Sequence, residues 1–279
     1  MLRLSLISNV LLALIASLAS AQESPYFVTY NHHMEEPGNF EVAINPVFGV
    51  PKQGNRAVAS YLELEYGATG WWTTALYLDG QSTSRESSGF TGYRLENRFR
   101  LLMKEHRINP VLYVEFADVN GADKISKEIV GFDGWRDFIE PVAESRHEKK
   151  REIETKLILS NNTRGWNFAG NLIAERHLNA PPWEFGYALA TSRPLALAAT
   201  AGECRFCPEN VTLGLELYGG LGEEGHVTLH ETSHYIAPTI ALGLPSGTTL
   251  RVSPGWGLTG NSNRAFVRIG VSYEGRLFR

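Results

Sequence analysis

Hydrophobic and polar side chains alternate with a period of two over many short stretches of this chain. In the stretch 40–50, one side carries Phe40, Val42, Ile44, Phe48 and Val50, and the other carries Glu41, Ala43 and Asn45. The same pattern recurs over 61–66, 93–101, 112–116, 153–159, 211–217 and 267–274. Because successive side chains of a strand point to opposite faces, this alternation predicts β-strands with one apolar and one polar face.

Turn-forming residues separate the alternating stretches and predict how the strands connect. Short signals stand at 36–38, 67–70, 161–165, 193–194 and 245–247, and longer connections at 81–88, 121–151 and 204–208. Tight turns join antiparallel neighbours, so sequential hairpins are the simplest topology. We therefore expect an all-β, antiparallel domain of twelve to fourteen strands over residues 40–279.

The N-terminus has the composition of a secretory signal peptide. Arg3 supplies a positive charge, residues 4–18 are predominantly apolar, and Ala19-Ser20-Ala21 is a small-residue cleavage site. We expect removal of residues 1–21, which leaves residues 22–39 as a periplasmic N-terminal segment. No second long apolar stretch follows, so the mature chain can enter a membrane only as a closed barrel.

Alternation alone fits two structures, a transmembrane barrel and a soluble exported β-sandwich with one face in its core. The tryptophans favour the barrel, because transmembrane barrels concentrate aromatic residues at both membrane interfaces. Trp71, Trp72, Trp166, Trp183 and Trp256 all lie near predicted strand ends, and Trp135 lies inside the longest loop.

With these features the chain resembles Gram-negative outer-membrane β-barrel proteins, in particular the porin-like or transporter-like group. The resemblance is carried by the repeated pattern, the signal peptide and the final strand 264–275. It implies a location in the cell outer membrane, contact with outer-membrane lipid, insertion by the barrel-assembly machinery, and passage or binding of a small polar solute. The chain departs from the group at Phe278, which is out of phase with Val267 to Tyr273.

If the apolar residues face lipid, charged residues face the lumen. The expected ladder of charge pairs consists of Glu63, Glu65, Arg94, Glu96, Arg98, Arg100, Glu115, Glu154 and Lys156. Such a ladder either fills and rigidifies the lumen or selects the solute in a narrow conduit. The arginines would attract an anion, but the glutamates cancel much of their field, so the sign of the solute stays open. The charged loop 121–151 is expected to gate access, to form a short surface helix or to present a recognition surface.

The densest group of potential metal ligands contains His226, His230 and His234. On a helix an interval of four would place them on one face, but on a strand it separates them by about 13 Å. Polar loop residues are therefore the default interpretation, and a metal site is the alternative. A further alternative is a lipid-modifying hydrolase that uses His230 with Ser233 or His234, although the strand-borne motifs of such enzymes are not reproduced.

The remaining composition narrows the possible functions. Lys and Arg number 26 against 30 Asp and Glu, a balance that argues against a nucleic-acid partner. Cys204 and Cys207 have CxxC spacing, but there is no second CxxC for zinc and no following histidine for haem, so we expect a local disulfide in an exported chain. No cofactor is indicated. A closed structural barrel and a soluble exported binding protein remain alternatives to the solute channel.

Overall fold

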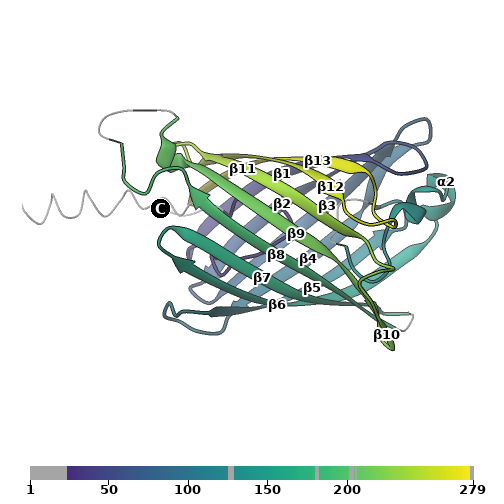
Figure 1. Cartoon of the computed structure of the whole chain (residues 1–279), viewed down its shortest axis with the longest axis horizontal. Helices are drawn as coiled ribbons and strands as arrows, with labels where there is room; N and C mark the ends of the chain where they lie inside the picture. Colours follow the sequence, from purple (N-terminus) through teal and green to yellow (C-terminus); the bar gives the residue numbers. More distant parts are fainter. Residues whose placement is uncertain (1–23, 125–128, 180–181, 201–203, 205, 277–279) are drawn as a thin grey trace, which may run out of the picture.

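The computed structural model describes residues 24–124, 129–179, 182–200, 204 and 206–276, and Figure 1 shows its strands as a tilted barrel. The expected signal peptide and Phe278 lie outside the described residues. Twelve long strands and the two-residue strand β10 form one sheet. The strands are β1 (Asn39–Val50), β2 (Ala57–Thr69), β3 (Trp72–Thr83), β4 (Ser88–Arg100), β5 (Asn109–Asn120), β6 (Lys149–Thr163), β7 (Trp166–His177), β8 (Trp183–Pro194), β9 (Val211–Glu223), β10 (His226–Val227), β11 (His234–Gly243), β12 (Thr248–Gly257) and β13 (Ala265–Arg276).

Every long strand pairs with two antiparallel neighbours, so the sheet closes on itself. The first strand pairs with the last from Asn39↔Arg276 to Val50↔Ala265, and β8 pairs with β9. The long strands have 10 to 15 residues, enough for a tilted strand to cross hydrocarbon. The expected all-β antiparallel barrel is confirmed, with a strand count at the lower end of the expected range.

The two ends of the barrel differ in their connections. We call the end where β1 begins and β13 finishes the terminal end, and the opposite one the loop end; they lie at the left and right of Figure 1. The loop end carries the connection 121–148, with the short helices η2 (Trp135–Phe138) and α2 (Val142–Ser145). The terminal end carries the connection 195–210 with η3 (Pro208–Asn210). Among the described residues, no helix is long and apolar enough to span a membrane.

Side chains on the two faces of the barrel wall have opposite character. The outer face exposes large apolar residues on nearly every strand, among them Ile44, Leu95, Leu112, Leu157, Leu172, Leu213, Ile240 and Val271. The inner face encloses polar and charged residues, including Glu41, Asn45, Asp79, Asn171 and Glu216. This distribution is the reverse of that in a soluble β-sandwich, where the apolar faces meet in the core, and it is typical of a transmembrane barrel.

Candidate functional site

The inner wall between β2 and β6 carries the expected charge ladder. Arg94 of β4 lies against Asp79 of the neighbouring strand β3, with its Nε 2.9 Å from Oδ2 and its Nη2 3.0 Å from Oδ1. On its other side Nη1 donates to Glu115 Oε2 of β5 at 3.3 Å. The guanidinium carbon also lies 4.4 Å from the ring centre of Tyr77. A fork-like pairing of this kind holds the arginine in one geometry.

Four residues further along β4, Arg98 forms a second cluster. Its guanidinium pairs with Glu65 of β2, and its Nε lies 2.7 Å from Glu96 Oε1. The other oxygen of Glu96 accepts hydrogen bonds from the hydroxyls of Tyr30 at 2.9 Å and Tyr77 at 2.7 Å. Tyr77 also lies 2.8 Å from Glu63 Oε1. Four of the ladder residues therefore belong to a single network.

Lys156 extends the network to β6. Its ammonium nitrogen lies 3.0 Å from Glu154 Oε1 and stands over the rings of Tyr30 and Tyr113, 4.5 Å and 4.0 Å from their centres. The Tyr113 hydroxyl donates to Glu115 at 2.9 Å, which joins this cation to the cluster of Arg94. Arg100 lies apart, near the terminal end, where Nη2 donates to the carbonyl of His32 at 3.4 Å.

The structure brings the ladder residues other than Arg100 together on the inner wall, and it adds residues that the sequence pattern missed. Asp79 and the rings of Tyr61, Tyr77 and Tyr113 are enclosed beside the arginines. The sequence did indicate where the tyrosines lie. Tyr61 and Tyr113 stand two residues before Glu63 and Glu115, so each shares a strand face with a glutamate. With Asp79, the ladder contains six carboxyl groups and the four cations Arg94, Arg98, Arg100 and Lys156.

Of the expected periplasmic segment 22–39, residues 24–32 lie against the inner wall of the barrel. Their backbone amides at Phe27, Val28 and Thr29 donate to the Glu216 carboxylate of β9, at 3.1, 2.9 and 2.8 Å. Three donors converging on one carboxylate form a charge-assisted contact that is stronger than ordinary hydrogen bonds. The physical reason for the difference is that the wall offers hydrogen-bonding partners to an irregular backbone, which has no partners of its own.

Further contacts hold the same segment along its length. The amide side chain of Asn171 accepts from the Tyr30 nitrogen at 2.7 Å and donates to the Tyr30 carbonyl at 2.8 Å. Arg251 Nη1 donates to the carbonyls of Ser24 and Tyr26 at 3.2 and 3.1 Å. Near the terminal end, the His32 amide donates to Ser160 Oγ at 2.8 Å. A cavity of about 110 Å³ remains between the segment and the charge ladder.

The connection 121–148 folds back over the loop end and reaches the same interior. Gly131 forms a β-bridge with Gly222 of β9. Ile129 packs on the enclosed cluster of Val28, Val47, Ala188, Tyr218, Tyr235, Ala237 and Phe266, against which Phe27 also packs. The N-terminal segment and the long connection therefore meet the same apolar cluster from opposite ends of the lumen. The short helix α2 (Val142–Ser145) lies in this connection, where a short surface helix was one of the expected outcomes.

The three candidate metal-ligating histidines are not held together. They lie in the connection from β9 to β11 and at the start of β11. This segment does not form a helix, so the interval of four does not place the three histidines on one face. His226 is exposed and lies 3.4 Å from Glu231, and His230 is exposed in the turn. His234 is enclosed, with its Nδ1 3.0 Å from the Tyr187 hydroxyl. The one group of metal-ligating composition in the described part of the chain is Glu152, Glu175 and His177.

The same hairpin end does not assemble the hydrolase residues considered from the sequence. Ser233 is completely enclosed, and its hydroxyl donates to the carbonyl of Asp133 at 2.6 Å rather than to a histidine. His230 stays exposed in the turn. A nucleophile for membrane lipid has to face the lipid, which this enclosed serine does not.

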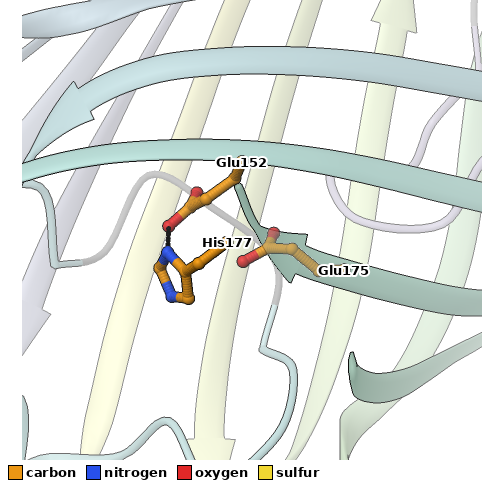
Figure 2. Close-up of side chains that lie close together, drawn as sticks. All are labelled: Glu152, Glu175 and His177. Carbon is orange, nitrogen blue, oxygen red and sulfur yellow. Dashed lines mark ion pairs between the residues drawn. The ribbon is translucent and has the colours of Figure 1, made fainter. Parts of the chain in front are cut away.

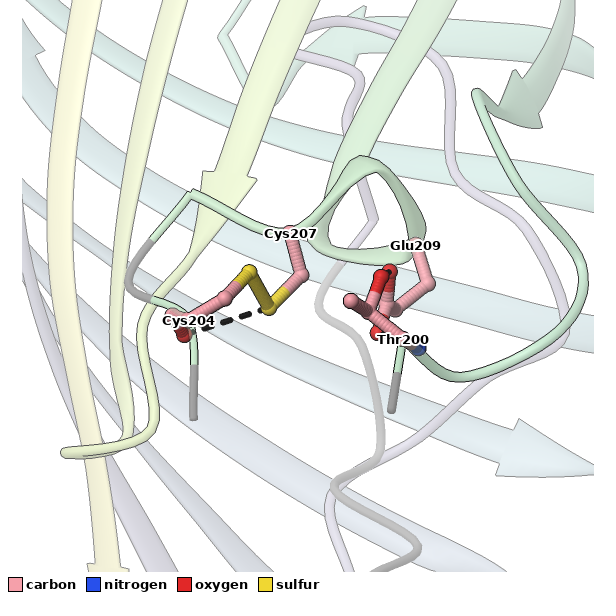
Figure 3. The surroundings of a disulfide bond; sticks show 4 residues. All are labelled: Thr200, Cys204, Cys207 and Glu209. Carbon is pink, nitrogen blue, oxygen red and sulfur yellow. Dashed lines mark hydrogen bonds between the residues drawn. A yellow bond between two sulfur atoms is a disulfide. The ribbon is translucent and has the colours of Figure 1, made fainter. Parts of the chain in front are cut away.

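At the terminal end, the connection 195–210 contains a disulfide between Cys204 and Cys207, three residues apart (Figure 3). Beside it, the Thr200 hydroxyl donates to Glu209 Oε2 at 2.8 Å, which ties the two sides of the connection together. The disulfide belongs to this connection and not to the inner wall. It therefore stabilises a loop and takes no part in the charge ladder.

Comparison with known proteins supports the fold. No family model matches the chain, and no curated protein matches it. An outer membrane channel from Pseudomonas putida F1 is similar with a TM-score of 0.53 and 12% identity, over 88% of this chain and 98% of the channel. The NanC porin has a TM-score of 0.48 and 9% identity, over 84% and 98%. The KdgM porin, solved in complex with disordered oligogalacturonate, has a TM-score of 0.47 and 10% identity, over 84% and 98%. The chain thus has the fold of an outer-membrane channel.

Proposed function

We propose that this protein is an outer-membrane channel for small polar solutes, closed in the observed state by its own N-terminal segment. The observation that carries the proposal is the enclosed wall of charged residues inside an apolar outer belt. Burying this many charges is costly even when they are paired, and barrels that conduct solutes line their lumen in this way. Lipid around the belt and the barrel-assembly machinery during insertion are the partners that this location requires.

The excess of carboxyl groups over cations in the ladder supports a preference for cationic or uncharged solutes over anions. A ring of carboxylates lowers the energy of a cation within a narrow pore and raises that of an anion. Arg94 and Arg98 are each held between two carboxylates, so they act as spacers within the wall more than as anion sites. Arg94, for example, contacts Asp79 and Glu115 at once.

Opening requires the N-terminal segment to leave its position across the lumen. Glu216 is the strongest single contact of the segment with the wall, since three backbone amides converge on its carboxylate. Release of one end is sufficient in this scheme, because the residues from Asn39 onward stay in the sheet. The long connection 121–148 forms a second barrier at the loop end.

The proposal is tested by swelling of proteoliposomes in small sugars and amino acids. Wild-type protein should admit solute slowly, and Glu216→Gln should admit it several-fold faster because the neutral amide holds the three donors less strongly. Lysine should enter faster than glutamate through the same variant. Glu224→Gln, in an exposed loop position, is the matched control and should behave as wild type. Folded, inserted Glu216→Gln protein that admits no solute would contradict the proposal.

A further inference from the structure

Two neighbouring strands place three potential metal ligands together near the loop end of the barrel. Glu152 of β6 stands directly opposite His177 of β7. Glu175 lies two residues earlier on β7, and side chains two apart on a strand share a face. One carboxylate oxygen of each glutamate and one ring nitrogen of His177 lie within 4.8 Å of one another (Figure 2). Glu152 Oε1 lies 3.1 Å from His177 Nδ1.

The two carboxylates are enclosed, which distinguishes them from ordinary surface acids. Glu152 is 2% exposed and Glu175 is 7% exposed. Glu175 stands directly opposite Glu154, which is paired with Lys156, on one side and opposite Glu184 on the other. Carboxylates in directly opposite positions repel each other, so a bound cation at this place would stabilise the arrangement.

The group opens onto a cavity that leaves room for the remaining ligands of an ion. The cavity has a volume of about 240 Å³, and its lining includes the carboxylates of Asp133, Asp137, Glu140 and Glu184. Two lysines, Lys124 and Lys150, line it as well, so carboxylates outnumber ammonium groups among the described residues of the lining. The cavity is therefore an acidic vestibule in which water can complete a coordination sphere.

We propose that Glu152, Glu175 and His177 bind a divalent transition-metal ion in this vestibule. Two carboxylate oxygens and one imidazole nitrogen suit Zn²⁺ and its first-row neighbours, and three protein ligands leave positions for water or an exchanging ligand. Atoms bonded to one ion at about 2.1 Å lie at most about 4.2 Å apart, so small side-chain rotations would complete the site. The site belongs to the wall and does not depend on whether the barrel conducts.

The test is calorimetric titration of ZnCl₂ into the untagged, folded protein in detergent at pH 7.5. One ion should bind per chain, with a dissociation constant in the micromolar range or tighter. His177→Gln and Glu175→Gln should each weaken binding by at least tenfold, and their folding is verified by circular dichroism and by heat-dependent mobility on a gel. The use of two single variants on different ligands protects the test against the loss of one of them to misfolding.

His226→Ala is the matched control, because His226 and Glu231 form an exposed histidine–carboxylate pair near the same end but with only two ligands. It should bind Zn²⁺ as wild type does. The proposal is overturned if wild type binds no ion below 100 µM, or if binding survives in both site variants or disappears in His226→Ala. If the wild-type protein binds no ion, Lys124 and Lys150 are the groups that balance the charge of the vestibule carboxylates.

Discussion

Arg94 shows how strongly a single enclosed charge depends on its neighbours. It is 4% exposed and contacts carboxylates of two adjacent strands. Removal of the guanidinium would take this cationic partner from two enclosed carboxylates. Breaking a buried ion pair of this kind costs about 3–5 kcal/mol. Arg94→Met should therefore lower the free energy of unfolding by that amount, measured by urea titration of the protein in phospholipid vesicles.

The control for this substitution is Arg151→Met. Arg151 lies 3.1 Å from Asp118, but its side chain is 46% exposed, and exposed pairs contribute about 0–1 kcal/mol. Equal losses in the two variants would show that the Arg94 cluster is solvated and adds no more than a surface pair.

The sequence predicted an inward-facing residue correctly where apolar and polar positions alternate strictly around it. Glu115 and Arg94 were placed inward because each stands between apolar neighbours on strands of strict phase. Asp79 escaped because Thr73 and Thr74, and then Ala75 and Leu76, put residues of similar polarity on the two faces of its strand, which hides the inner face. Glu152 and His177 escaped because their proximity depends on the register between β6 and β7, which the composition of either strand does not contain.

The N-terminal segment is the element whose place in the lumen was not foreseen. No periodic pattern marks residues 24–38, and their partners Glu216 and Asn171 are more than a hundred residues away. One signal existed in β2 at Gly67. Any larger residue at this position would place its side chain against the backbone of Glu35 and Glu36. A glycine inside a strand often marks such a close approach of another backbone.

The same element provides a pH dependence. Enclosure first, and the neighbouring His33 second, lower the pKa of His32 from 6.5 to about 4. A released segment recovers the ordinary pKa, so it binds more protons than the docked segment between pH 6.5 and 4. Docking is therefore fully favoured above pH 6.5 and weakens as the pH falls through this window. Channel opening, recorded in planar bilayers, should increase from pH 7 to pH 5.

In His32→Gln that increase should be smaller, because Gln does not titrate. His33 stays in place and retains its own contribution, since enclosure lowers its pKa too. Identical pH profiles for wild type and His32→Gln would remove His32 from the account of docking.

At the scale of the whole molecule, the period-two pattern predicted the barrel, because a closed sheet in lipid separates apolar and polar positions strand by strand. The tryptophans at strand ends agree with this, since Trp72, Trp166 and Trp183 each begin a strand. The lengths of the connections were a weaker guide to the two ends of the barrel: the longer connections 81–88 and 121–151 lie at the loop end, whereas 204–208 lies at the terminal end.

The outer face gives a prediction for the molecule in a bilayer. Leu157 lies in the middle of β6 and is 40% exposed on the outside. Leu157→Arg should lower the free energy of unfolding in vesicles by about 2–4 kcal/mol, the cost of an arginine near the bilayer midplane. Leu197→Arg, in the terminal connection, should cost about 0–1 kcal/mol. A small cost at position 157 would mean that this face does not contact hydrocarbon.

The central claim is that the barrel is a solute channel closed by its own N-terminal segment. It is tested most directly by single-channel recording in planar bilayers of the full mature chain and of a variant that lacks residues 24–36, after both have been shown to fold. The account predicts rare or small conductance steps for the full chain, and long, larger steps with cation preference for the shortened one. A shortened protein that folds and inserts but never conducts would contradict the claim.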